Sequence, residues 1–403
     1  MKKATLAMTL AAICAWMMMG CGQQSNGVSD TTAKAPETQA AESQAAESRG
    51  QETADAGQDE ENPGAAAGEK DSYYIEMVGN SFAVQFCNIN VDGARAAADE
   101  LGNVTLNYNA SQDSSQVQEQ IDILNQALAK KPDAILIAAA DPDALEAQMI
   151  KAKEENIPVV AYDIAFNQAP EGSLRATVST NNTAAAGLAA EKLMENEAFL
   201  AKVKEASADQ PLIVSCLAPD AVMTAHEQRI RGFTERLYDL LQEYQPDAVE
   251  ITGHTSFEKA SAQPAAVSIH TEIPPTKADA DIRNQAQKMI SENDVAAVFC
   301  VNEASVTALL SATTDGMDLD KEKGKYKSLI AIGFDAGRTM KGAVASQYFY
   351  GAVAQDPFAM GYEGLKLCVD AVNGESVEDI DAPAVWYDHT NMEEEDIAKI
   401  LYD

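Results

Sequence analysis

The sequence predicts an α/β protein made of two doubly wound lobes, each with a parallel sheet. From residue 73 onward, short apolar stretches of strand length alternate with longer segments whose apolar residues recur every three or four positions. This alternation occurs in two successive runs, at residues 73–196 and 212–372. Strands that alternate with helices form parallel sheets covered on both faces, and each run has the size of an ordinary domain.

The first run owes its assignment to two kinds of pattern. Residues 134–138 form a continuous apolar stretch, as expected for a strand buried on both faces. Residues 116–130 place Val117, Ile121, Leu124 and Leu128 on one helical face. The same criteria predict strands at 73–77, 104–108, 134–138, 159–162 and 176–179, and helices at 90–101, 116–130, 144–155 and 182–196.

The second run repeats the pattern after a polar interval. Residues 295–301 are continuously apolar, like the buried strand of the first run. The predicted strands lie at 212–217, 249–252, 267–272, 295–301, 329–333 and 349–354, and the predicted helices at 225–243, 278–291, 305–311, 340–345 and 358–372.

The first 21 residues have the features of a bacterial lipoprotein signal peptide. Two lysines precede an uncharged apolar stretch at residues 4–19, which is short for a membrane-spanning helix. Gly20 and Cys21 follow and resemble a lipobox, although Met18 and Met19 depart from its usual residues. We expect cleavage before Cys21, lipidation of its thiol and attachment outside the cytoplasm to the bacterial cell membrane. An ordinary signal peptide or an uncleaved anchor stays open as an alternative.

Residues 22–71 are expected to be a disordered acidic tether. They contain hardly an aliphatic residue larger than Ala, so they cannot bury enough apolar surface to offset the entropy of ordering. The net charge of the whole chain is −34, which argues against nucleic acid as a partner.

No catalytic, metal or cofactor motif is present in the sequence. There is no Gly-x-Ser-x-Gly, no phosphate-binding Gly-rich loop and no His-Glu-x-x-His, so an enzyme is not expected. Cys87, Cys216, Cys300 and Cys368 lack the close pairing of a metal site. We expect buried thiols and leave disulfide pairing open.

Polar residues follow the predicted strands where a ligand site is expected. Asp163, Asn302, Asp335 and Gln355 each come directly after an apolar stretch, and Arg229 lies in the first turns of the helix after 212–217. Open parallel sheets bind ligands beyond the carboxyl ends of their strands. Together these side chains offer the acceptors and donors that buried hydroxyl groups require. Taken singly, each is better explained as a helix cap or turn former, and their recurrence at nearly every strand end favours a ligand site.

An ordered series of short motifs between residues 73 and 387 resembles a known family. The chain is similar to periplasmic sugar-binding proteins of the ribose-binding type, the type I periplasmic binding proteins of ABC transporters. The motifs are Val91-Asp92-Gly93-Ala94, residues 131–137, Asp141-Pro142-Asp143-Ala144, residues 157–163, residues 229–233, residues 297–303, Ile332-Gly333-Phe334-Asp335 and Ala354-Gln355-Asp356-Pro357.

The resemblance implies that the strand-end polar residues hydrogen-bond a sugar. It also implies that Phe86 covers the apolar face of the sugar, with Asn80 nearby, although Phe86 could equally be a core residue. Cys87 stands where the family usually has a second aromatic residue, and Ile164 where ribose binders place an arginine. Residues 204–211 and 257–275 look like variable insertions. The sugar-binding residues implied are Asp163, Arg229, Asn302, Asp335 and Gln355.

The function implied is the capture of a small polar solute, a sugar, and delivery of that solute to an ABC transporter permease. The protein itself is expected to be a monomer. Residues 72–180 and 356–383 would form the N-terminal lobe, and 181–355 and 384–403 the C-terminal lobe, with three hinge strands near Thr180, Gln355 and Ala384. A sensor that presents its ligand to a chemoreceptor or kinase is the alternative. A sugar-responsive repressor would need a basic helix-turn-helix headpiece, which this N-terminus does not provide.

Overall fold

The computed structural model describes residues 70–166, 168–292 and 294–402. The predicted signal peptide, Cys21 and nearly all of the predicted tether lie outside these residues. Among the described residues no helix is both long and apolar enough to cross a membrane, and no cluster of His, Cys, Asp and Glu is arranged to hold a metal ion.

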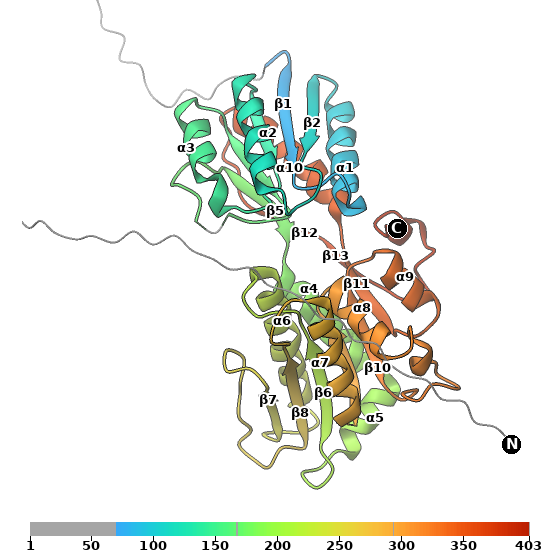
Figure 1. The fold of residues 1–403 in the computed structure, drawn as a ribbon. Helices are drawn as coiled ribbons and strands as arrows, with labels where there is room; N and C mark the ends of the chain where they lie inside the picture. Colours follow the sequence, from blue (N-terminus) through green and yellow to red (C-terminus); the bar gives the residue numbers. More distant parts are fainter. Residues whose placement is uncertain (1–69, 167, 293, 403) are drawn as a thin grey trace, which may run out of the picture. The chain divides into compact units, whose positions relative to one another are not determined.

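The first lobe contains, in the described part of the chain, a six-stranded parallel sheet in the order β12-β5-β4-β3-β1-β2 (Figure 1). Its strands are β1 (Tyr73–Gly79), β2 (Val104–Ala110), β3 (Ala134–Ile137), β4 (Val159–Tyr162), β5 (Ala176–Thr180) and β12 (Ile380–Ala382). Helices α1 (Gln85–Leu101), α2 (Val117–Ala129), α3 (Glu146–Glu154) and α10 (Pro357–Val372) cover it.

The pleat of β3 explains why that strand is apolar throughout. Leu136 packs in one cluster with residues of α1 and α10, whereas Ile135 and Ile137 pack with α2 and α3. Because alternate side chains point to opposite faces, a strand covered by helices on both sides must be apolar at every position. The continuous apolar stretch of the sequence therefore predicted this strand.

Helices α1 and α10 cross where two glycines allow their backbones to meet. A Cβ atom on Gly361 would lie 1.8 Å from the carbonyl oxygen of Asn90, and one on Gly93 would lie 2.0 Å from that of Phe358. Neither position can therefore accept a larger residue without moving a helix backbone.

The second lobe holds a seven-stranded sheet in the described residues, in the order β13-β11-β10-β9-β6-β8-β7. All its pairings are parallel except that of β13 with β11. The strands are β6 (Leu212–Leu217), β7 (Val249–Thr252), β8 (Val267–Glu272), β9 (Val295–Cys300), β10 (Ile330–Phe334), β11 (Gly351–Gln355) and β13 (Ala384–Tyr387).

Helices again pack on both faces of the second sheet. Its helices are α4 (Asn182–Glu195), α5 (Glu197–Glu205), α6 (Thr224–Leu241), α7 (Asp279–Glu292), α8 (Glu303–Ala312) and α9 (Arg338–Ala345), and a short α11 (Glu395–Ala398) follows β13. Phe299 and Phe334 pack with α4 and α6, whereas Val298 and Cys300 pack with α7 and α8. The predicted fold class of two doubly wound parallel-sheet lobes is confirmed.

Within the described residues the chain passes from one sheet to the other three times. The passages follow β5, β11 and β12, at residues 180–182, 355–357 and 382–384. Three connections were expected from the sequence because a helix and a strand near the C-terminus had to return to each lobe.

Several predicted element bounds were wrong. The helix expected at 90–101 begins at Gln85, so Phe86 and Cys87 lie in its first turn and not in a loop. Helix α5 was not predicted, and the expected insertion at 204–211 starts at the end of this helix. The expected insertion at 257–275 contains β8, which has the bounds predicted for it and pairs with both β6 and β7. Polar residues in the first turns of α1 and along α5 interrupt the apolar periodicity on which the prediction depended.

The four cysteines of the described residues are free and buried, as expected. Burial, together with the nearby Asp163 carboxylate, raises the pKa of the Cys87 thiol to about 12. Burial also raises the pKa of the Cys216, Cys300 and Cys368 thiols, so all four cysteines favour the protonated thiol.

Candidate functional site

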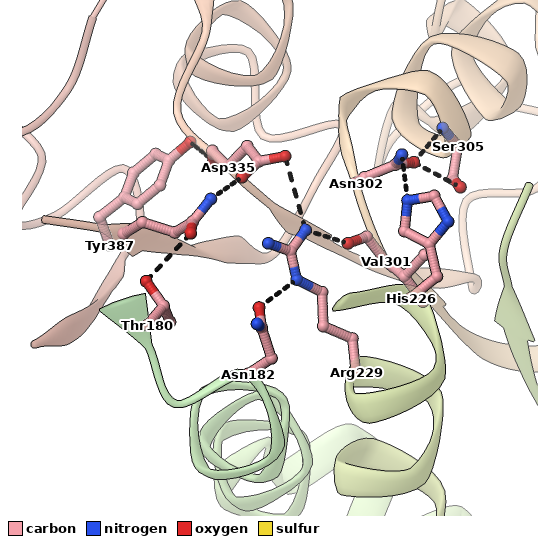
Figure 2. A network of polar contacts seen from close by, with 10 residues as sticks. Thr180, Asn182, His226, Arg229, Val301, Asn302, Ser305, Asp335 and Tyr387 are labelled. Carbon is pink, nitrogen blue, oxygen red and sulfur yellow. Dashed lines mark hydrogen bonds and ion pairs between the residues drawn. The ribbon is translucent and has the colours of Figure 1, made fainter. Parts of the chain in front are cut away.

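Arg229 is the centre of a buried polar network at the carboxyl end of the second sheet (Figure 2). The residue lies on α6 and is 6% exposed. Its Nε donates to Oδ1 of Asn182 at 2.8 Å, and its Nη1 donates to the carbonyl oxygen of Val301 at 3.0 Å. The guanidinium carbon lies 3.8 Å from the ring centroid of Phe334. Two hydrogen bonds and the ring below hold the guanidinium plane in one orientation.

Asp335 directly follows β10 and faces this guanidinium. Its Oδ2 lies 3.8 Å from Nη1 of Arg229, and its Oδ1 accepts a hydrogen bond of 2.8 Å from Nε2 of Gln355. Burial lowers the pKa of Arg229, while the carboxylates of Asp335 and Asp163 act in the opposite direction. The neighbouring carboxylates thus stabilise the charged form of Arg229 against the loss of hydration.

Gln355 links this pair to one of the connections between the sheets. Its Oε1 accepts a hydrogen bond of 3.0 Å from the hydroxyl of Thr180, the last residue of β5. Figure 2 shows this chain of contacts running from Thr180 to Asp335 and on to Arg229. The connections between the sheets after β5 and β11 therefore begin at residues whose side chains belong to the hydrogen-bond network of the site.

Asp163 lies at the end of β4 in the first sheet and is partly buried. The pKa of its carboxyl is raised to about 7: loss of hydration is the largest cause, the guanidinium of Arg229 acts against the rise, and the carboxylate of Asp335 adds to it. Two carboxylates and one guanidinium from different sheets are thus electrostatically coupled. Asp163, Arg229, Asp335 and Gln355, all predicted from the sequence, are brought together.

Asn302 caps α8 and contacts a histidine that the sequence did not single out. Its Oδ1 accepts from the backbone N–H and the hydroxyl of Ser305 at 3.0 and 2.9 Å, and its Nδ2 lies 3.0 Å from Nε2 of His226. Nδ1 of His226 lies 3.1 Å from Oδ2 of Asp220. Burial lowers the pKa of His226, so the network assigns a neutral ring that donates to Asp220 and accepts from Asn302.

Among the described residues, no hydrogen bond or ion pair joins the side chains of Phe86 and Asn80 to the network around Arg229. Phe86 is 9% exposed at the start of α1, and its ring contacts that of Tyr402 edge to face at 5.8 Å between centroids. Asn80 is buried, and its Oδ1 lies 3.2 Å from Sγ of Cys87. A direct role of either residue in binding stays a prediction.

A cavity of about 650 Å³ lies beside the network. Its wall combines Asp163, Arg229 and Gln355 with Asn182 and with the apolar Val222 and Met223. A second hollow of about 630 Å³ includes Lys131, Glu155 and Arg175, which are exposed and precede strands of the first sheet. We regard the first as the candidate site because ligands of parallel sheets bind at the carboxyl ends of strands.

Residues that were not predicted from the sequence complete the site. Asn182 was not among the predicted sugar-binding residues, yet its side-chain oxygen accepts a hydrogen bond from the guanidinium of Arg229. His226 precedes Arg229 by three positions, which places both on one face of α6 and could have indicated it. Tyr387 donates to the carbonyl oxygen of Asp335 at 3.0 Å, and no pattern pointed to that contact.

Comparison with known proteins agrees with the fold described above. A family model described as periplasmic binding protein domain matches residues 75–376. A search of curated proteins found no match. A solved structure described as an ABC transporter, LacI family transcriptional regulator from Brachyspira murdochii is 29% identical, with a TM-score of 0.70, and the match covers 82% of this chain and 99% of that one.

Two further solved structures share the fold at lower identity. A carbohydrate transporter solute binding protein from Agrobacterium radiobacter, in complex with D-arabinose, is 23% identical with a TM-score of 0.58 and coverage of 82% and 99%. A solute binding protein from Agrobacterium vitis with bound D-fucose is 22% identical with a TM-score of 0.59 and coverage of 82% and 100%. With three quarters of its length matched by the family model and with the strand-end site described above, this chain belongs to the periplasmic binding protein domain family.

Proposed function

We propose that the chain is an extracytoplasmic solute-binding protein that captures a sugar between its two lobes and delivers it to an ABC transporter permease. The observation that carries the proposal is the meeting of Asp163 from the first sheet with Arg229 and Asp335 from the second, beside a cavity of about 650 Å³. The structural neighbours that contain D-arabinose and D-fucose support a sugar as the solute.

The chemistry of the site suits a neutral molecule rich in hydroxyl groups. A hydroxyl donates one hydrogen bond and accepts others, so its burial requires acceptors and donors in the same small space. The carboxylates of Asp163 and Asp335 are acceptors, whereas the guanidinium of Arg229 and the amide of Gln355 supply donors. The contacts of Asp335 with Arg229 and Gln355 keep these three groups paired until a solute arrives, which reduces the cost of leaving buried charges alone.

Binding by lobe closure follows from the three connections between the sheets. A solute that bridges Asp163 and Arg229 favours the state in which both residues reach it, so its binding energy shifts the lobes toward closure. A permease would then bind the closed, solute-bound form in preference to the open, empty form.

The N-terminal sequence supports attachment by a lipid at Cys21. A single acyl chain gives marginal membrane binding, and several chains or a further signal give stable attachment. Residues 22–71 would then separate the lobes from the membrane surface.

A ligand screen tests the proposed function directly. The unfolding temperature of the protein is measured with D-arabinose, D-fucose or D-ribose, and in parallel with nucleosides and amino acids. The affinity of each compound that raises this temperature is then measured by calorimetry. A sugar at one hundred times its dissociation constant should stabilise the fold by about 2.7 kcal/mol. Stabilisation by amino acids or nucleosides alone would exclude a sugar as the solute.

A further inference from the structure

The loop between β6 and α6 presents two large apolar residues at the cavity beside Arg229. Val222 is 90% exposed and Met223 is 50% exposed, and both line this cavity of about 650 Å³. Among the described residues no large apolar residue is more exposed than Val222. Exposed apolar groups that gather at a cavity mark a place of contact with a ligand or a partner.

The backbone of this loop is held by the carboxylate of Asp220. Its Oδ1 accepts hydrogen bonds from the backbone N–H groups of Val222 and Met223 at 2.8 and 2.7 Å, and its Oδ2 lies 3.1 Å from Nδ1 of His226. Asp220 itself is 9% exposed. The two apolar residues are therefore presented by a turn that a largely buried carboxylate holds in place.

The first lobe contributes an aliphatic residue to the same cavity. Ile164 is partly buried and lines the cavity, and its backbone N–H donates to the carbonyl oxygen of Tyr162 at 2.7 Å. The backbone N–H groups of Ile164, Val222 and Met223 are thus all bonded within the protein. These three residues, here called the aliphatic patch, offer a solute apolar side chains and no backbone donor.

A solute in this cavity meets two different kinds of surface. The groups of Asp163, Arg229 and Gln355 accept and donate the hydrogen bonds that hydroxyl groups require. A hydroxyl buried against the aliphatic patch would instead lose its hydrogen bonds to water without replacement. A methyl group gains free energy when it is buried at the same place.

We propose that the aliphatic patch makes the site selective for a 6-deoxyhexose, a sugar with a methyl group where a hexose has a hydroxymethyl group. The inference rests on the proposed function, since it names the class of sugar that the same site takes. The ring hydroxyls bind the polar network, and the methyl group packs against the aliphatic patch. A hexose would bury an unpaired hydroxyl there, and a pentose would leave the patch without a contact.

Three matched sets of sugars test the inference in calorimetric titrations of the full chain. The pyranoses of one set share their ring stereochemistry and differ in the group on C5, which is hydrogen, methyl or hydroxymethyl. The sets are L-arabinose, D-fucose and D-galactose; D-xylose, 6-deoxy-D-glucose and D-glucose; and L-lyxose, L-rhamnose and L-mannose. In the set that wild type binds best, the 6-deoxyhexose should bind on the order of tenfold more tightly than either partner.

A double variant, Val222→Thr with Met223→Gln, replaces the second lobe's part of the patch with polar side chains of similar size. It should reduce the preference for the 6-deoxyhexose over the hexose by about fivefold or more, because the added hydroxyl then finds partners. Met317→Gln is the matched control, since Met317 is 57% exposed and does not line the cavity. Both replaced residues are exposed, so thermal unfolding should match that of wild type.

Several outcomes would overturn the inference while leaving the proposed function intact. Equal weakening of all sugars by the double variant would show that the loop serves lobe closure alone. An unchanged preference, or the same change in Met317→Gln, would show that the loop does not contact the methyl group. If sugars bind but no 6-deoxyhexose binds more tightly than both of its partners, the inference is wrong by itself. If no sugar binds, the inference and the sugar specificity proposed above are both wrong.

Discussion

Asp163 and Asp335 occupy equivalent places in two different sheets. Asp163 follows β4 and donates its backbone N–H to Val178 of β5, and Asp335 follows β10 and donates its own to Val353 of β11, both at 2.9 Å. Both residues have left-handed backbones, with φ of 63° and 77°. Such a conformation is uncommon outside glycine and tolerated best by Asp and Asn. The turn that ends each strand therefore directs a carboxylate toward the polar site. Asp163 in the first lobe and Asp335 in the second share this left-handed conformation.

Replacement of Arg229 should weaken solute binding and also destabilise the second lobe. Arg229→Ala removes a charge-assisted hydrogen-bond donor, which corresponds to a loss of about 1.5–3 kcal/mol, or roughly ten- to a hundredfold in affinity. It also leaves Asn182 and the Val301 carbonyl without this partner. Calorimetry with a bound sugar measures the first effect and thermal unfolding the second.

Arg236→Ala is the control for this change. Arg236 lies two turns further along α6, is exposed and pairs with Glu191 at the surface, so it should affect neither measurement appreciably. Equal effects of the two variants would contradict the role given to Arg229.

The carboxyl of Asp163 should make stability depend on pH. Its pKa is about 7 in the folded protein and about 3.9 in an unfolded chain, so the folded state binds the proton more tightly. The contribution of Asp163 to the free energy of unfolding is therefore fully present below pH 4 and is lost as pH rises through 7. Asp163→Asn, which cannot ionise, should be more stable than wild type at pH 8 by on the order of a few kcal/mol. Denaturant unfolding should show that this advantage disappears at pH 4; a difference independent of pH would be inconsistent with the raised pKa.

His226 should act through the orientation of Asn302. His226→Phe leaves the amide of Asn302 and the carboxylate of Asp220 without their ring partner, and an unpaired buried group costs about 1–3 kcal/mol. We expect a lower midpoint of unfolding and weaker solute binding. His389→Phe, at an exposed position, should change neither. Normal stability and affinity in His226→Phe would show that Asn302 needs no such support.

The crossing of α1 and α10 should be intolerant of a single methyl group. Gly361→Ala places a Cβ atom 1.8 Å from the carbonyl oxygen of Asn90, so one helix backbone must shift, and overpacking of this kind costs about 1–3 kcal/mol or more. Gly342→Ala on α9 meets nothing within 4 Å and should stabilise its helix by up to about 1 kcal/mol. Thermal unfolding of the two variants should therefore shift in opposite directions, and a shift in the same direction would contradict the described crossing.

The proposed lipid anchor depends on one thiol. Cys21→Ala removes the atom that acylation requires, so the protein should leave the membrane fraction or accumulate as an unprocessed precursor. Cell fractionation followed by immunoblotting measures both. Membrane association equal to that of wild type would exclude lipidation at Cys21.

The sequence determined the fold class because local patterns report directly on burial. Residues 134–138 and 295–301 are apolar throughout, and strands β3 and β9 are buried on both faces in the structure. The strand-end positions of Asp163, Asp335 and Gln355 followed from the same patterns, since parallel sheets place their carboxyl ends at one edge. Element bounds were less certain at α1 and α5, where polar residues interrupt the apolar periodicity.

Only the tertiary structure decided which side chains contact one another. Asn182 and Arg229 are far apart in sequence, and their hydrogen bond exists because α4 and α6 pack closely at Gly232, where a Cβ would lie 2.2 Å from the Thr183 carbonyl oxygen. Tyr402 lies beyond the last predicted helix, and no local pattern relates its ring to Phe86, which precedes it by more than three hundred residues. Periodicity records which face of an element is buried, whereas contacts between distant residues depend on how the chain packs in three dimensions.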